Sequence, residues 1–190
     1  MMNLPPELQS ALLGKRVVFL RGQLDDTTAN TAMSQLLLVA RTAPGQMIQL
    51  YLDTPGGSFG PTLAVYDFVR TLEAPVSTIC VGRAGGGSVL VLAGGANGLR
   101  FALPHARIEL KDERADLPAG STNDLPRQAD EAARVRARWQ AALVGHTAHS
   151  SAQLARDLTA GRWLSAAEAR DYGLVDGILP TGPVLARNQS

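Results

Sequence analysis

A glycine-rich turn lies in the middle of the chain, within the sequence CVGRAGGGSVLVLAGG of residues 80–95. The apolar run Val76–Val81 before it predicts a strand, and the run Val89–Ala93 after it predicts a buried helix. Many hydrolases place a nucleophile at the tip of such a strand-to-helix elbow. Here the tip is Gly85–Gly87, which has no nucleophilic side chain. We therefore expect an elbow kept for its backbone, because glycine lets other segments approach closely.

The hydroxyl nearest to this tip belongs to Ser88. Together with Lys111 it would form a Ser-Lys dyad, an arrangement in which lysine activates a serine nucleophile. Ser88 lies two residues past the tip, however, where the start of a helix would turn its hydroxyl elsewhere. We expect Ser88 to cap that helix, and the dyad is kept as an alternative.

Metal ligands are scarce in the sequence. His146 and His149 have helical spacing, but no third ligand accompanies them, and we expect a solvated helix end rather than a metal site. Cys80 is the single cysteine, which excludes an internal disulfide or a cysteine-based zinc site and favours a reducing cytoplasm. The sequence thus predicts no metal and no cofactor.

Composition narrows the class of protein further. With 190 residues, 45% of them apolar and 18% charged, the chain fits one soluble globular domain with a hydrophobic core. A net charge of +1 argues against general binding to nucleic acid or to a membrane surface. We expect no signal peptide and no membrane-spanning run, and hence a cytoplasmic location.

Strands and helices alternate along the chain from Val17 onward, a pattern typical of the α/β class. A polar stretch with Pro118 and Gly120, residues 111–124, predicts a loop. The expected strands are Val17–Leu20, Met47–Leu52, Val76–Val81, Arg100–Leu103 and His105–Leu110. The main expected helices are Ala29–Arg41, Pro61–Leu72, Leu125–Gly145 and Gln153–Leu158. The cluster Asp25–Thr28 is expected to cap the first of these helices, and the capping box Ser165–Glu168 to open a further one.

Five segments together resemble the ClpP family, the proteolytic subunit of the Clp protease: KRVVFLRGQLDD, IQLYLDTPGGS, LAVYDFVRTLEAPVSTICVGRA, GLRFALPHARIEL and LSAAEARDYGLVDGIL. They follow in the order of that family and extend from Leu12 to Leu179. The resemblance implies a crotonase-like spiral of ββα units with a protruding helical handle. It also implies a single domain over residues 1–190, with a head of about 12–110 and 150–180 and a handle of about 111–149.

The resemblance implies Ser-His-Asp chemistry, but the three matching positions carry other residues. The nucleophile's place, counted from Ala84, is Gly86; the histidine's place after ALPHARIEL is Lys111; the aspartate's place before Arg162 is Gly161. Glycine offers neither an oxygen nor a carboxylate, and lysine is mostly protonated near neutral pH. We therefore expect no catalytic residues here. Gly86→Ser alone should not restore activity, whereas the further changes to histidine and aspartate could recover some.

Other sites implied by the resemblance are partly retained. The glycine pair ending at Gly57 is intact, and the N–H groups of Gly57 and Gly87 could still bind an oxyanion. The groove that would receive loops of an ATPase unfoldase keeps apolar or aromatic residues at Tyr51, Ile79, Val81, Leu103 and Leu179, while Gln49 and Thr71 are polar. We expect weakened docking, because aromatic anchors dominate interface energies.

The handle also departs from the resemblance. The stretch Asp112–Pro118 replaces an edge strand with charges and a proline, and Ala160 replaces an arginine used between rings. The expected function is that of an inactive structural or regulatory subunit, in a heptameric ring of its own or mixed with active ClpP subunits. Two alternatives stay open: an active serine-type hydrolase using Ser88 and Lys111, and a crotonase-like acyl-CoA-binding protein, for which the glycine loops show no acidic residue.

Overall fold

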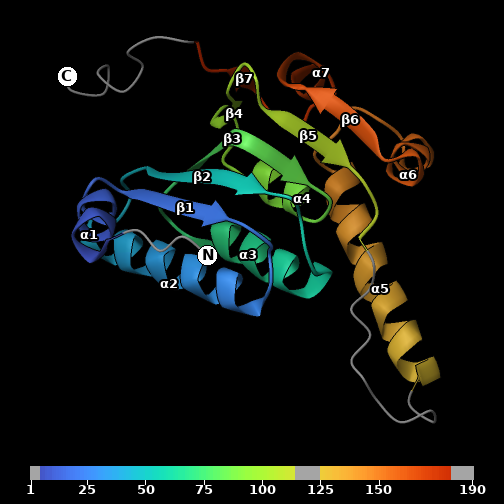
Figure 1. Ribbon diagram of the computed structural model, residues 1–190, viewed down its shortest axis with the longest axis horizontal. Coiled ribbons are helices and arrows are strands. Elements are labelled where there is room, and N and C mark those ends of the chain that lie inside the picture. Colours follow the sequence, from blue (N-terminus) through green and yellow to red (C-terminus); the bar gives the residue numbers. More distant parts are fainter. Residues whose placement is uncertain (1–4, 114–124, 181–190) are drawn as a thin grey trace.

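The computed structural model describes residues 5–113 and 125–180 of the chain (Figure 1). Strands and helices alternate through most of it, as the sequence pattern predicts. In chain order the elements are α1 Pro6–Gly14, β1 Val17–Arg21, α2 Asp26–Thr42, β2 Ile48–Thr54, α3 Phe59–Thr71, β3 Val76–Gly85, α4 Ser88–Ala93, β4 Arg100–Ala102, β5 Arg107–Leu110, α5 Leu125–Val144, α6 Ser151–Ala160, β6 Arg162–Ser165, α7 Ala166–Asp171 and β7 Gly177–Ile178.

Within the described ranges, seven strands form one mostly parallel sheet. The strands β1, β2, β3, β4 and β7 lie side by side in that order, all parallel. The long strand β3 changes partner along its length: Thr78–Cys80 pairs with β4, and Arg83–Gly85 pairs with β5. An antiparallel pairing of β5 with β6 extends this second part of the sheet. The elbow follows directly after the part of β3 that pairs with β5.

Helices α2 and α3 cover one face of the sheet, with α4 beside them (Figure 1). Burial alternates along β2, where Ile48, Leu50 and Leu52 are fully buried while Gln49 and Tyr51 are half-buried. The buried set packs with the helices into a single hydrophobic core. All six residues of α4 are buried, as expected for the apolar run that follows the elbow.

Two of the three capping predictions are confirmed. Asp25 is the N-cap of α2, and its carboxylate accepts a hydrogen bond from the backbone N–H of Thr28 at 2.8 Å. Ser165 and Glu168 form both halves of the capping box that opens α7. At α4, in contrast, Gly87 is the N-cap and no side chain caps it, so the expectation that Ser88 caps this helix is wrong.

Helix α5 extends away from the sheet, and the part nearest its C-terminal end anchors it (Figure 1). Trp139 and Leu143 are fully buried there. The indole Nε1 of Trp139 donates to the carbonyl of Gly87 at 3.2 Å, and its ring lies 5.1 Å from the ring of Phe59. The helix is therefore tied directly to the glycine elbow. Among the described residues, no helix is both long and apolar enough to cross a membrane.

Candidate functional site

The elbow forms as the sequence predicts, with β3 ending at Gly85 and α4 beginning at Ser88. Gly86 has a φ of +49°, in the left-handed region that favours glycine. Its N–H donates to the carbonyl of Glu109 on β5 at 2.9 Å. A Cβ added at Gly85 would come within 2.5 Å of the Pro55 carbonyl oxygen, so the glycine loop after β2 packs directly on the elbow.

Two backbone N–H groups, those of Gly57 and Gly87, point at one place beside the elbow; we call them the amide pair. Gly57 is fixed by the segment around Leu24, whose N–H donates to Gly56 at 2.9 Å and whose carbonyl accepts from Ser58 at 3.1 Å. A Cβ on Gly57 would collide with the backbone of Leu24. Gly87 is held by the indole of Trp139, which donates a hydrogen bond to its carbonyl. Neither donor depends on a catalytic side chain for its position.

The carboxylate of Glu113 lies in front of the amide pair. Its Oε1 accepts hydrogen bonds from Gly57 N–H at 3.1 Å and from Gly87 N–H at 3.2 Å. The same oxygen lies where a side chain on Gly86 would begin, so a Cβ built there collides with it. The glycine loops themselves contain no acidic residue, as the sequence shows, but an acidic residue from another segment lies against both of them.

Glu113 was missed because it lies within a stretch that predicts only a polar loop. The signal that could have located it is the alternation Glu109, Lys111, Glu113, which continues the period of a strand past the end of β5. Such a continuation places all three side chains on the same side. It could not reveal the contacts with Gly57 and Gly87, which lie 56 and 26 residues away in sequence.

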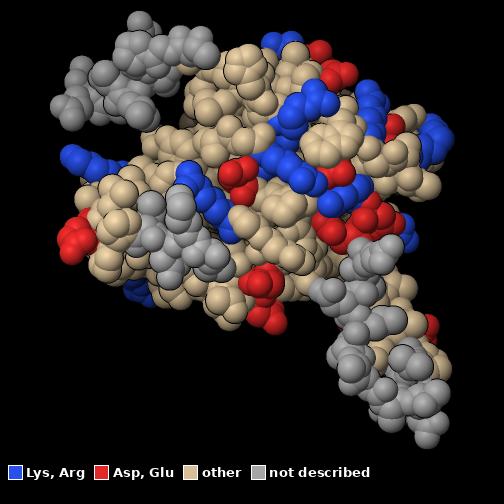
Figure 2. All heavy atoms as spheres, viewed as in Figure 1, with Lys and Arg blue, Asp and Glu red and all other residues tan. Residues whose placement is uncertain are grey.

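Burial raises the pKa of the Glu113 carboxyl above its ordinary value. The positive charge of Lys111 and the two N–H donors oppose this increase, and the negative charge of Glu109 adds to it. Glu109 is itself held by Arg83, with Nη2 at 2.5 Å, and by Lys111, with Nζ at 3.6 Å. The neighbourhood combines two carboxylates and two cations (Figure 2 shows Lys and Arg gathered over the β5–β6 end).

The three positions predicted to replace a catalytic triad lie in different settings. Gly86 is at the elbow tip, and Lys111 forms the ion pair with Glu109. Gly161 is the left-handed C-cap of α6, with φ +63° and ψ +47°. Its position has open space around it among the described residues, since a Cβ there would meet no atom within 4 Å. The group of Gly86, Lys111 and Gly161 supplies no nucleophile–base–carboxylate set.

The carboxylate of Asp157, whose backbone carbonyl accepts a hydrogen bond from Gly161, serves the structure. Asp157 is buried on α6 and accepts from the Tyr172 hydroxyl at 2.8 Å and from Gln153 Nε2 at 3.1 Å. Burial raises the pKa of this carboxyl, but its hydrogen bonds to Gln153, Tyr172 and Arg162 outweigh burial and bring the pKa below its ordinary value. These bonds hold α6 against α7 and β6.

Ser88 is buried within the elbow. Its hydroxyl donates to the Gly85 carbonyl at 2.8 Å and accepts from the Gly85 N–H at 3.1 Å. Both of its hydrogen-bonding roles are used to close the turn. The Lys111 ammonium pairs with Glu109. The two members of the alternative dyad thus each make other bonds.

A row of large side chains crosses the sheet face opposite α2 and α3. Strand register aligns Phe19, Tyr51, Ile79 and Phe101 on neighbouring strands. The rings of Phe19 and Tyr51 lie 5.3 Å apart. Sequence reasoning named Tyr51 and Ile79 but missed the two phenylalanines, which only strand register places beside them. The other predicted groove residues, Val81, Leu103 and Leu179, are half-buried, whereas Ile79 is 3% exposed.

The two histidines of the H-x-x-H spacing have separate partners. His146 Nε2 lies 2.9 Å from the Tyr66 hydroxyl, and the His149 ring lies 4.1 Å from the ring of Tyr172. Burial lowers the pKa of His146. Among the residues that the structure describes, no group of three or more metal-ligating side chains gathers.

A comparison of the sequence with known protein families agrees with these features. The family model for the Clp protease matches residues 6–182, and the chain belongs to this family. A Clp protease proteolytic subunit-like protein of Streptomyces coelicolor is 43% identical over 172 residues, covering 90% of this chain and 82% of the relative. ATP-dependent Clp protease proteolytic subunit 2 of Streptomyces avermitilis is 39% identical over 170 residues, covering 90% and 85%. Subunit 2 of Corynebacterium jeikeium is 36% identical over 177 residues, covering 93% and 85%.

Proposed function

We propose that this chain is a catalytically inactive proteolytic-subunit homologue that serves as a structural or regulatory ring subunit of a cytoplasmic Clp-type complex. The observation that supports this most is at the elbow. The nucleophile-equivalent position is Gly86, and the space for a side chain there is taken by the carboxylate of Glu113. Lys111 and Gly161 supply neither a neutral base nor an orienting carboxylate.

Assembly is the role that remains for such a subunit. Members of the family form oligomeric complexes with ATPase partners, and the sheet and helices of the head, about 12–110 and 150–180, have a continuous core. The proposal gives the chain a single domain with α5 in a handle of about 111–149. Rings would be heptamers of this chain or mixtures with active Clp proteolytic subunits. The row of large side chains formed by Phe19, Tyr51, Ile79 and Phe101 supports docking of an ATPase loop. The polar residues Gln49 and Thr71 would weaken this docking.

Two alternatives have less support. An active hydrolase would need Ser88 as its nucleophile, but that hydroxyl is buried and bonded to Gly85. An acyl-CoA-binding protein would need the amide pair to bind the carbonyl of a thioester. The carboxylate of Glu113 already accepts hydrogen bonds from both of these N–H groups.

Activity is tested on the purified protein with fluorogenic peptides and a fluorophosphonate probe. We expect neither hydrolysis nor labelling, and Ser88→Ala should change nothing. Stoichiometric labelling of any serine would overturn the claim of inactivity. Assembly is tested by light scattering, alone and after co-expression with an active Clp subunit from the same host. We expect about seven copies or a mixed particle; a monomer under every condition would overturn the subunit role.

A further inference from the structure

The amide pair already binds a ligand, and the ligand is part of the chain. We infer that the amide pair is a carboxylate-binding site whose resident ligand is Glu113, and that it accepts a free carboxylate from solution once Glu113 is removed. The ligand class is a monocarboxylate, either a small acid or the C-terminus of a short peptide. This goes beyond the proposed function, since binding here requires neither ring assembly nor the loss of hydrolysis.

The donors select for an anionic acceptor. Two N–H groups from separate segments, after β2 and before α4, converge on the single oxygen Oε1 of Glu113. Hydrogen bonds from backbone N–H to an ionised acceptor are about twice as strong as those to a neutral one. The ammonium of Lys111 acts on the same carboxyl and favours its charged form. A carboxylate thus gains more in this place than an amide or ester carbonyl of the same size.

Glycine at position 86 leaves space beside the amide pair for a carboxylate. Any side chain at Gly86 would begin where the carboxylate of Glu113 now lies. Gly86 is also held in position by its own N–H bond to Glu109, independently of Glu113. The absence of a side chain at the elbow tip and the presence of a carboxylate beside it are therefore two halves of one packing arrangement.

Glu113 competes with outside ligands because it is covalently attached. A tethered group acts at a high effective concentration, which a small acid in solution can match only at millimolar levels or above. The competition is limited by the cost of burying the charge, which Lys111 offsets and the nearby carboxylate of Glu109 increases. In the native chain the site is accordingly closed to dilute carboxylates, and truncation of Glu113 opens it.

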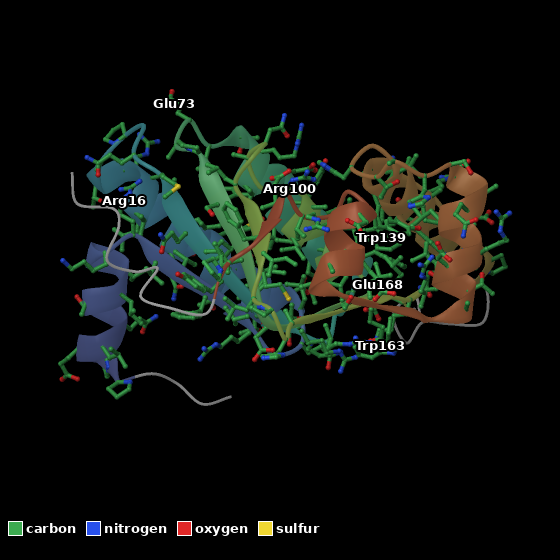
Figure 3. The ribbon with its side chains drawn as sticks, turned by 90° about the horizontal axis from the view of Figure 1, so that it is seen from above. Arg16, Glu73, Arg100, Trp139, Trp163 and Glu168 are labelled. Atoms are coloured by element: carbon green, nitrogen blue, oxygen red, sulfur yellow. The ribbon has the colours of Figure 1, made fainter. Side chains whose placement is uncertain are left out.

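Trp139 provides a reporter beside the site, since its indole donates to the carbonyl of Gly87. The sequence has two tryptophans, so Trp163→Phe leaves Trp139 alone. Trp163 is 41% exposed, and Figure 3 places it at the rim of the molecule, apart from Trp139. Glu73, exposed in the turn before β3 and far from Trp139 in Figure 3, offers a matched glutamate for a control.

The test titrates Trp163→Phe, Trp163→Phe/Glu113→Ala and Trp163→Phe/Glu73→Ala at constant ionic strength. The probes are sodium acetate, an N-acetyl dipeptide with a free carboxylate, and the same dipeptide as its C-terminal amide. We expect acetate and the dipeptide acid to change Trp139 fluorescence saturably, with an affinity at least tenfold higher for the Glu113→Ala protein than for the other two. The dipeptide amide should cause no change in any of the three. Tighter binding of the dipeptide acid than of acetate assigns peptide C-termini; equal binding assigns small acids.

A second measurement follows the amide pair itself. In protein labelled with ¹⁵N-glycine, Glu113→Ala should move the Gly57 and Gly87 amide protons upfield, and acetate should move them back. Glu113→Gln, which keeps the size of the side chain without its charge, should give a smaller upfield shift. Unchanged Gly57 and Gly87 signals in both variants would overturn the inference, as would equal affinity for the dipeptide acid and its amide.

Discussion

The amide pair and the two positions Lys111 and Gly161 are held in opposite ways. A Cβ on Gly57 would collide with the backbone of Leu24, and a Cβ on Gly87 would collide with the side chain of Thr62. The buried indole of Trp139 also binds the Gly87 carbonyl. Lys111 is 30% exposed and Gly161 has open space around it among the described residues. We call Gly57 and Gly87 the backbone part of the site, and Lys111 and Gly161 the side-chain part. The backbone part is closely packed, whereas the side-chain part is not.

For the inactive subunit proposed above, the comparison gives a way in which chemistry could be lost without loss of the fold. A catalytic side chain contributes little to the core, and its removal leaves the surrounding segments in place. The glycines of the elbow and of the β2 loop allow those segments to meet. The two N–H groups of the amide pair therefore converge on one oxygen without help from Lys111 or Gly161.

The largest expected effect is at the backbone part. Gly57→Ala should lower the free energy of unfolding by about 3 kcal/mol, because the new Cβ collides with the backbone of Leu24. Gly60→Ala is the control: its Cβ would meet no described atom within 4 Å in the first turn of α3, and it should raise stability by up to about 1 kcal/mol. Urea denaturation measures both. Equal effects would break the comparison.

Gly86→Ser tests whether the side chain of Glu113 occupies the space in front of Gly86. A non-glycine residue in the left-handed region costs about 1–2 kcal/mol, and the serine must also displace Glu113. In Gly86→Ser/Glu113→Ala the loss should be smaller than the sum of the single losses, because the collision is gone. Strict additivity would show that Glu113 does not occupy this space.

The same contact sharpens the expectation that restoring serine, histidine and aspartate could recover some activity. The triple change at Gly86, Lys111 and Gly161 leaves Glu113 in the place of the new serine and in front of the amide pair. Adding a fourth change, Glu113→Ala, should therefore raise any hydrolysis of a fluorogenic peptide above that of the triple variant.

A pH dependence of stability should follow from Glu113. Its pKa is raised in the folded protein by burial, with Lys111 opposing and Glu109 adding to the shift, so the unfolded chain releases this proton at lower pH. As pH rises from below the ordinary value of 4.5 through the raised pKa, the native protein should lose stability relative to Glu113→Gln. Unfolding by urea between pH 4 and 7.5 measures the difference, with Glu73→Gln as the control. A rise in the relative stability of the native protein would contradict the raised pKa.

The smallest effect should be at the side-chain part. Gly161→Asp introduces a residue that tolerates the left-handed conformation of a helix C-cap, into open space. We expect a loss below about 1 kcal/mol, and Lys111→Ala should also cost less than about 1 kcal/mol because its ion pair is partly solvated. Thermal denaturation measures both. A cost at Gly161 that matches Gly57→Ala would remove the distinction between the two parts.

Periodic and capped elements could be predicted from the sequence, because their signals are local. The strands near Val17 and Met47 and the helix after Asp25 lie within a few residues of their expected bounds. Strand β6 was missed, since the four residues from Arg162 become a strand only by pairing with β5. Helix α1 was also missed; it buries none of its residues, so its sequence carries no clear apolar face.

The candidate site divides in the same way. The elbow and the amide pair could be predicted from glycine positions and the resemblance to a family. The position of Glu113 could not, because it depends on contacts with Gly57 and Gly87 that no short window of sequence contains. The predicted departures in the stretch Asp112–Pro118 lie mostly outside the described residues, and their effect on ring stacking stays a prediction.

The change of partner along β3 also determines when the site can form during folding. Parallel pairings join segments that are distant in sequence, so each requires closure of a long loop and forms slowly. The last residues of β3, Arg83–Gly85, pair with β5, and Ala84 also lies opposite Thr54 of β2, so we expect this part of β3 to become ordered only after β5 has paired. A folding intermediate with only β1, β2 and the first part of β3 would have a hydrophobic core but no elbow. The amide pair is therefore expected to be among the last features of the head to appear, and hydrogen exchange during refolding should protect Gly87 later than Leu50.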